Sequence, residues 1–188
     1  MSASDGWCLN ILDGGRLERL DYDGLLRFHQ GHAMWGATVA FRALQRAGRY
    51  LSGSGLWDRR SLTVTSAHPG PGVRDAVEYV TRCVGRGRYL LTRPELAGSC
   101  GKDVQYAWWI DDGTRIVSVQ LREGFVPEDF FTLVGRMETA MEQPDDRDRL
   151  EQVKGQLIDR LWTEPLELLF QVTEATGAPG ATVSPCTS

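Results

Sequence analysis

Apolar residues recur with helical spacing in the first third of the chain. Between residues 33 and 47 they occupy positions 33, 34, 37, 40, 41, 44 and 47, which form one stripe on a helix. This pattern predicts a helix from Ala33 to Arg46 that ends with Gly48 as its C-cap. It also places three polar residues on the solvent face, namely Arg42, Gln45 and Arg46.

Two further patterns predict strands and a second helix. Residues 61–66 alternate in polarity and lead into a Pro/Gly turn at 67–72, after which residues 73–83 have helical spacing. Later in the chain, two β-rich runs at 105–110 and 114–121 are joined by an Asp-Gly pair, which is a strong signal for a β-hairpin.

Weaker signals divide the remaining chain. Residues 7–12 suit a strand or a docking arm, and residues 24–28 suit one or two helical turns. Prolines 127 and 144 predict the starts of two helices that reach about residues 141 and 162. Residues 168–172 are apolar enough for a last strand.

The order of these elements predicts an α+β fold, a small mixed sheet with a hairpin that helices cover. A chain of 188 residues is long enough to bury a core, and we expect a single domain over residues 1–174. Residues 1–6 and the Gly/Pro/Thr/Ser-rich tail at 175–188 are expected to be disordered.

Composition narrows the classes of partner. The net charge is −4 and the basic residues are dispersed, so we expect no nucleic-acid partner. Because the sequence shows neither a signal-peptide pattern nor a long apolar run, we expect no membrane partner and a cytoplasmic location. The four cysteines lack CxxC spacing and are expected to be free thiols: Cys8, Cys83, Cys100 and Cys186.

Two of the three histidines lie at the start of the main predicted helix. His29 and His32 are three residues apart, and the thioether of Met34 follows them. Such side chains bind metals, orient protons or fill a core, and all three interpretations stay open. The third histidine, His68, follows a predicted strand, where it would either meet a ligand or brace the Pro/Gly turn.

Other candidates for chemistry are single residues. Cys83 lies among arginines, which lower the pKa of a thiol, at a helix C-terminus, which raises it. Asp75 lies in the first turn of the same helix, where an acidic side chain is favoured whatever its role. Lys102 is one of two lysines and is either a specific ammonium site or a surface residue. Several aromatic residues would line an apolar pocket or fill the sheet core: Trp35, Trp57, Tyr106, Trp108 and Trp109.

Motifs spread along the chain resemble those of one family. Residues 30–36, Gln-Gly-His-Ala-Met-Trp-Gly, resemble the His-Gly-His-x-Cys-Pro-Gly signature of the FmdE-like family, which takes its name from a component of formylmethanofuran dehydrogenase. Residues 75–83 are similar to that family's Asp-Ala-Ile-Gln-x-x-Thr-Gly-Cys, and residues 85–87 stand near its Gly-Lys-Gly. Gly101-Lys102 and residues 162–172 are similar to later elements of the family, in the same order.

The resemblance implies an α+β fold, commonly dimeric, with a metal site. At the positions that match the family's metal ligands, His32 and Cys83 are residues of the same type as in the family. Met34 replaces a cysteine, and Gly72 stands where another cysteine would be. The cysteines of the family's C-terminal zinc ribbon are missing, so this would be a divergent member. Losing thiolates lowers the affinity of the site for zinc. The remaining set would therefore suit a weakly held transition metal such as zinc or iron, haem iron, or no metal at all.

Three hypotheses for function follow. The first is an FmdE-like metal-binding protein or metal-dependent enzyme, whose metal faces a small-molecule pocket lined by tryptophans. The second is a metal-free enzyme in which Cys83 is the nucleophile or acid, His32 or His68 is the base, and Lys102 places an anionic substrate. The third is a non-enzymatic accessory protein that binds a cofactor. We also expect a homodimer.

The same residues recur in these hypotheses. The candidate catalytic residues are His32, Cys83, Lys102 and Asp75, the candidate cofactor-binding residues are His29, Met34, Trp35 and His68, and the candidate metal ligands are His32, Cys83 and His68.

Overall fold

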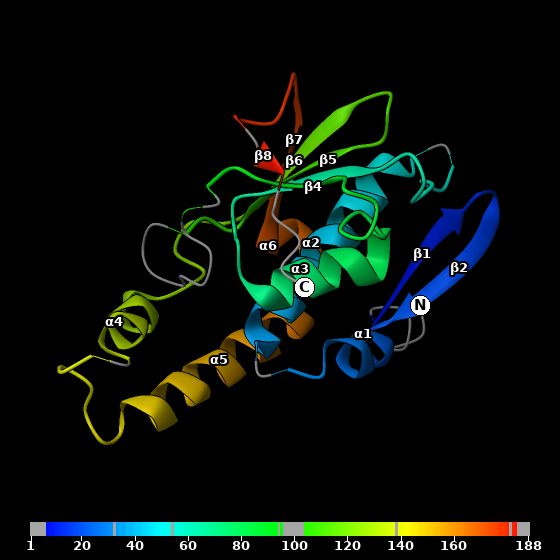
Figure 1. The fold of residues 1–188 in the computed structure, drawn as a ribbon. Coiled ribbons are helices and arrows are strands. Elements are labelled where there is room, and N and C mark those ends of the chain that lie inside the picture. Colours follow the sequence, from blue (N-terminus) through cyan, green and yellow to red (C-terminus); the bar gives the residue numbers. More distant parts are fainter. Residues whose placement is uncertain are drawn as a thin grey trace.

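The computed structural model describes residues 7–31, 33–53, 55–93, 95, 104–137, 139–180 and 182–183. Within them the chain forms a mixed sheet, a separate two-stranded hairpin and helices that pack against both (Figure 1). The predicted α+β class and the helix-covered mixed sheet are therefore confirmed. The prediction for residues 1–6 lies outside the described residues.

The described strands of the large sheet follow the order β7-β6-β5-β3-β4-β8. β3 (Thr63–Ser66) pairs with β4 (Tyr89–Leu91) in parallel and with β5 (Ala107–Asp111) in antiparallel orientation. β5 and β6 (Ile116–Leu121) form the hairpin that the Asp-Gly pair predicts. β3 thus lies at the middle of the sheet, and its end is where the turn at 67–72 begins.

The two edge strands come from the end of the chain. β7 (Phe170–Ala175) pairs with β6, and the two-residue β8 (Thr182–Val183) pairs with β4, both in antiparallel orientation. β8 lies within the segment that composition predicts to be a disordered tail. Strand pairing uses backbone groups, so a segment rich in glycine, proline, threonine and serine can still add to a sheet edge.

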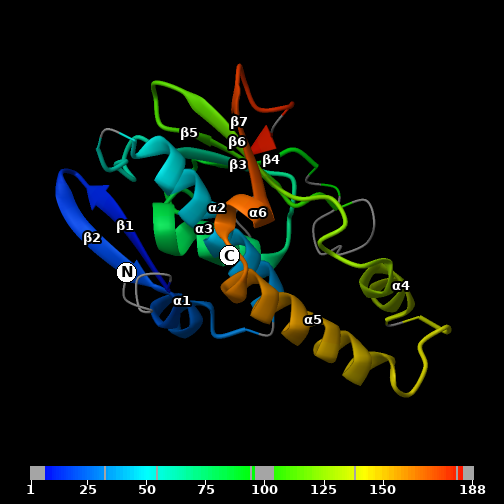
Figure 2. The same cartoon turned by 180° about the vertical axis from the view of Figure 1, so that it is seen from behind.

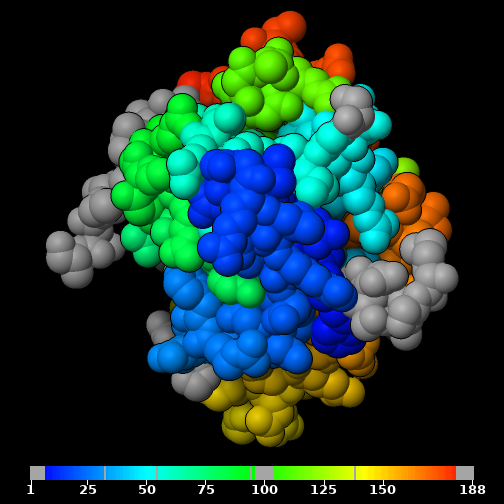
Figure 3. Space-filling model, turned by 90° about the vertical axis from the view of Figure 1, so that its right-hand side faces the viewer, coloured from blue at the N-terminus to red at the C-terminus, as the bar shows by residue number. Residues whose placement is uncertain are grey.

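A second, smaller sheet lies near the N-terminus. β1 (Cys8–Asp13) pairs with β2 (Arg16–Asp21), and Figure 3 shows this hairpin, in dark blue, spread over one face of the molecule. The strand is therefore the correct interpretation of residues 7–12. β2 was not predicted, because its charged residues and leucines lack the β-branched character that marks a strand.

The helices have the following bounds: α1 (Tyr22–His29), α2 (Met34–Leu51), α3 (Pro71–Thr81), α4 (Glu128–Arg136), α5 (Asp146–Thr163) and α6 (Leu166–Leu169). α4 ends five residues before its predicted end, where Thr139 Oγ1 donates a hydrogen bond to the Arg136 carbonyl. Within the described residues, none of the helices combines the length and the apolar character that crossing a bilayer requires.

The main helix, α2, is longer and more buried than its sequence pattern predicts. Gly48 lies inside it and is not its cap: a Cβ there would stand 2.9 Å from Cζ2 of Trp57, so glycine allows the indole to pack on the helix. Arg42 and Gln45 do not face solvent, being 4% and 3% exposed. Arg42 Nη1 donates to Gln45 Oε1, and Arg42 Nε donates to the Leu161 carbonyl, each at 2.8 Å. Hydrogen bonds thus replace water on this face.

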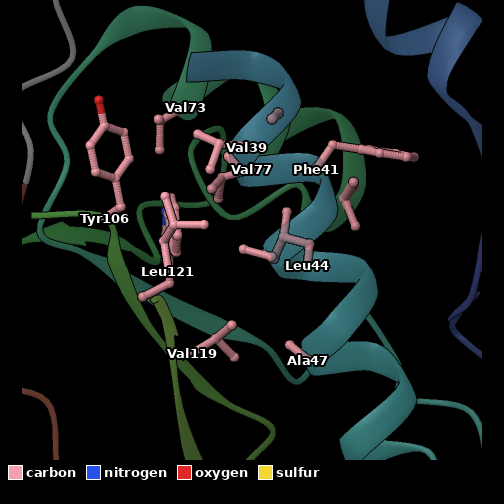
Figure 4. Packing of buried hydrophobic residues seen from close by; sticks show 14 of the residues in the cluster. Val39, Phe41, Leu44, Ala47, Val73, Val77, Tyr106, Val119 and Leu121 are labelled. Carbon is pink, nitrogen blue, oxygen red and sulfur yellow. The ribbon is translucent and has the colours of Figure 1, made fainter. Parts of the chain in front are cut away.

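The core lies around α2. α2 packs against α3 on one side and against β6 on another. Figure 4 shows Leu44 and Ala47 of α2 facing Val119 and Leu121 of β6, with Val73 and Val77 of α3 beside Val39. α4 and the first half of α5 project away from the sheet (Figures 1 and 2), so they form a separate wall near the start of α2.

Candidate functional site

The turn between β3 and α3 holds His68 in one orientation. Ser66 Oγ donates to the His68 carbonyl at 2.9 Å and accepts from the His68 N–H at 3.1 Å. The Gly70 N–H donates to His68 Nδ1 at 3.0 Å. A Cβ at Gly70 would lie 2.7 Å from Cε1 of the ring, so only glycine permits this approach.

These contacts determine which ring nitrogen of His68 carries the proton. Nδ1 accepts a hydrogen bond, so in the neutral ring the proton is on Nε2. Burial lowers the pKa of His68 from 6.5 to about 4, so the ring is neutral at pH 7. Nε2 is buried and has no hydrogen-bond partner among the described residues. His68 therefore provides a neutral N–H donor that the described residues do not use.

His68 lines a cavity of about 350 Å³ between the start of α2, the turn at 67–72, α4 and α5. This volume lies at the lower end of the range, roughly 300–1,000 Å³, of small-molecule pockets. Of the described residues that line it, only His68 and Lys154 have polar side chains that can reach a ligand, because the Trp35 N–H is already bonded. The other lining residues are apolar or glycine: Ala33, Trp35, Gly36, Gly70, Gly72, Phe130, Val134, Met137 and Leu150.

Aromatic side chains pack together along one wall of the cavity. Trp35 Nε1 donates to the Tyr106 hydroxyl at 2.8 Å, and the His68 and Tyr106 ring centroids are 4.8 Å apart. Trp35 also packs against Phe130 of α4, with 6.2 Å between centroids. Of the five aromatic residues suggested by the sequence for a pocket, Trp35 lines this cavity, whereas Trp108 is fully buried in the sheet core.

His29 and Asp75 meet at a second place, close to the start of α3. His29 Nδ1 lies 2.7 Å from Asp75 Oδ2, and the His29 side chain is only 4% exposed. The carboxylate accepts a hydrogen bond from Nδ1–H, so in the neutral ring Nε2 has the lone pair. Nε2 is buried and has no partner among the described residues. The sequence identified both residues as candidates but offered no reason to pair them.

Cys83 does not belong to either place. It follows the C-terminus of α3, and its thiol donates to the Leu62 carbonyl at 3.3 Å. Burial raises the pKa of the Cys83 thiol, and the side chain is fully buried. A raised pKa and the lack of exposure both oppose the nucleophile that the metal-free hypothesis requires.

The described members of the predicted metal-ligand set do not form one site. His68 precedes α3 and Cys83 follows it, and a helix of 11 residues is about 16 Å long. His68 would also have to give up the Gly70 hydrogen bond before Nε2 could bind a metal. No group of three His, Cys, Asp or Glu side chains suited to a metal occurs in the part of the chain that the structure describes.

Three further residues were predicted to belong to the site. Met34 begins α2 but does not line the cavity. His32 and Lys102 lie outside the described residues, as do two of the cysteines. The predicted roles of His32 and Lys102 therefore stay predictions.

Sequence reasoning missed the α4 and α5 residues of the cavity. Phe130, Val134 and Met137 recur with helical spacing, which predicts an apolar face on α4 but not what that face covers. Lys154 looks like any surface lysine in the sequence.

Comparison of the chain with protein-family models and with curated proteins gives no match. The resemblance to the FmdE-like family therefore stays a hypothesis based on the order of the motifs.

Proposed function

We propose that the protein binds a small, largely apolar molecule in the cavity between α2, α4 and α5, with His68 Nε2–H as its hydrogen-bond donor. One observation supports this: a buried N–H without a partner among the described residues belongs to a residue that lines an apolar cavity. An unsatisfied buried donor costs about 1–3 kcal/mol, which an acceptor on a ligand would offset.

Water is a poor substitute for such a ligand. A buried water needs 2–4 polar partners, whereas most side chains that line this cavity have no polar atom. A molecule with one carbonyl or similar acceptor and an apolar body matches both the donor and the walls. This proposal keeps the small-molecule pocket of the first hypothesis without requiring a metal.

Acetophenone tests the proposal, since it joins one carbonyl to an apolar ring. We expect saturable binding by calorimetry, and Val134→Trp should abolish it by filling the cavity. Val153→Trp is the matched control, because Val153 is also half-buried on a helix but does not line the cavity. Circular dichroism confirms that each variant folds. Equal binding to both variants would refute the proposal, as would a wild type that binds none of acetophenone, phenylacetate and phenylacetamide.

Metal binding is a second candidate, favoured by His29. A histidine whose Nδ1–H is held by a carboxylate presents Nε2 in the orientation that metal-binding histidines have. His29 would hold the metal through Nε2, and Asp75 would orient the His29 ring. Zinc titration of untagged protein tests this: His29→Gln should lose zinc, and His68→Gln should keep it. Equal zinc affinity in both variants and the wild type would exclude His29 as a ligand.

A further inference from the structure

We infer that the ligand of the cavity is an organic monoanion, an apolar body with one carboxylate, whose charged end lies between the N-terminus of α3, His68 and Lys154. This inference rests on the proposed function, because it requires that the cavity bind a small molecule. It adds the chemical class of that molecule.

The first turn of α3 has no capping side chain. α3 begins at Pro71 after Gly70 and has no acidic residue in its first turn, because Asp75 lies beyond the turn in which the sequence places it. The N–H groups of a first helical turn lack partners within the helix, and the helix dipole favours an anion there. Gly70 and Gly72 both line the cavity, so this end of the helix borders the ligand space.

His68 is a second reason to expect an acceptor, because it lines the same cavity. It is 2% exposed, and Nε2 has no partner among the described residues. Because the Gly70 N–H belongs to the same turn that fixes the ring, the imidazole donor and the start of α3 have fixed positions relative to each other. A carboxylate has two oxygens and can accept from both donors at once.

Lys154 adds the positive charge. Its side chain is 25% exposed and lines the cavity, and its ammonium donates to Glu151 at 2.7 Å. An ammonium has three donors, so two are left for a ligand. None of the described residues that line the cavity is acidic, so nothing described on its walls would repel an anion. A neutral ligand would not use the positive charge that Lys154 brings to this wall.

A matched pair of probes separates the charge from the shape. Phenylacetate and phenylacetamide have the same size and ring, but only the first is an anion at pH 7. We expect calorimetry on the full chain to give a dissociation constant about tenfold or more lower for phenylacetate.

Single substitutions test which residues cause the preference for phenylacetate. Lys154→Met keeps the stem, removes the charge, and should reduce the preference for phenylacetate by about tenfold. Arg147→Met is the control, since it removes a charge from the same helix at an exposed position that does not line the cavity. His68→Asn keeps an acceptor for the Gly70 N–H but loses the Nε2 donor, and it should also reduce the preference.

The outcomes distinguish the two proposals. Equal affinities for the two probes would overturn the anion inference and leave the proposed function standing. An unchanged preference in Lys154→Met and in folded His68→Asn would also overturn it, because the anion would then bind elsewhere. If neither probe nor acetophenone binds the wild type, the proposed function itself fails.

Discussion

Two histidines near the start of α3 have opposite hydrogen-bonding patterns. His68 Nδ1 accepts a hydrogen bond from a backbone N–H, so its Nε2 is a donor. His29 Nδ1–H donates a hydrogen bond to the Asp75 carboxylate, so its Nε2 is an acceptor in the neutral ring. Both Nε2 atoms are buried and have no partner among the described residues. The neighbour at Nδ1, and not the residue type, determines what each imidazole can bind.

The surroundings of the two rings differ as well. His68 lines an apolar cavity, while His29 is absent from its walls and packs beside Gly31, where a Cβ would lie 2.9 Å from His29 Cε1. His68 is therefore suited to bind an acceptor on an organic molecule. His29 is suited to bind a proton or a cation.

The different surroundings of the two histidines depend on the close approach of α2 to α3, which Gly72→Ala should disrupt. A Cβ at Gly72 would lie 2.7 Å from the Ala37 backbone nitrogen and would also meet the Ala33 carbonyl. Because backbone atoms cannot move aside cheaply, we expect a loss of about 3 kcal/mol or more in the free energy of unfolding, measured with urea.

Gly155→Ala is the matched control for that substitution. Nothing lies within 4 Å of the Cβ that it would add in α5, so we expect the variant to be about 1 kcal/mol more stable than the wild type. Equal stabilities of the two variants would show that α2 and α3 do not pack as described.

Acid should destabilise the fold through His68. The pKa of His68 is about 4 in the folded chain and 6.5 when unfolded, so between these values the unfolded state binds more protons. The contribution of neutral His68 to the free energy of unfolding is therefore fully present above pH 6.5. It is lost as the pH falls towards 4, by on the order of 3 kcal/mol. Urea unfolding at several pH values should show this loss in the wild type. The loss should be absent in His68→Gln and present in His29→Gln. If it is instead absent in His29→Gln and present in His68→Gln, His68 is not its cause.

The His29 pair should depend on its acceptor more than on its charge. Asp75→Ala leaves the Nδ1–H of a side chain that is 4% exposed without a partner, which should cost about 2 kcal/mol in urea unfolding. Asp75→Asn keeps an oxygen acceptor and should cost about 1 kcal/mol or less. If the two substitutions have equal effects, the hydrogen bond does not hold His29 as described.

The smallest effect is expected at Ser66, whose hydroxyl bonds the His68 N–H and carbonyl. Ser66→Ala should lower the free energy of unfolding by about 1 kcal/mol. Ser118→Ala, at a half-buried position on β6, is the control and should change stability less. The same loss at both positions would mean that Ser66 has no special part in shaping the turn.

The sequence predicted the elements better than it predicted their contacts. Helical spacing found α2, and the Asp-Gly pair found the β5–β6 hairpin, because these signals are local. Arg42 was assigned to solvent because its partner, the Leu161 carbonyl, lies 119 residues away. A buried polar face cannot be distinguished from an exposed one until its distant partners are known.

The same reason explains what was found and missed at the site. His68 and Trp35 were identified by residue type and position, and both line the cavity. The pairing of His29 with Asp75 spans 46 residues, and the α4 and α5 walls come from much later in the chain. Cys83 was placed with the histidines by motif, but the length of α3 separates it from His68.

The most direct test is the protonation of the His68 ring. Long-range proton–nitrogen NMR on protein labelled with nitrogen-15 in its histidines assigns the tautomer of each ring at pH 7. The account predicts that His68 carries its proton on Nε2, and that this nitrogen shifts when acetophenone is added while the His29 resonances do not. A His68 ring protonated at Nδ1, or an Nε2 signal that does not respond to bound acetophenone, would contradict the account.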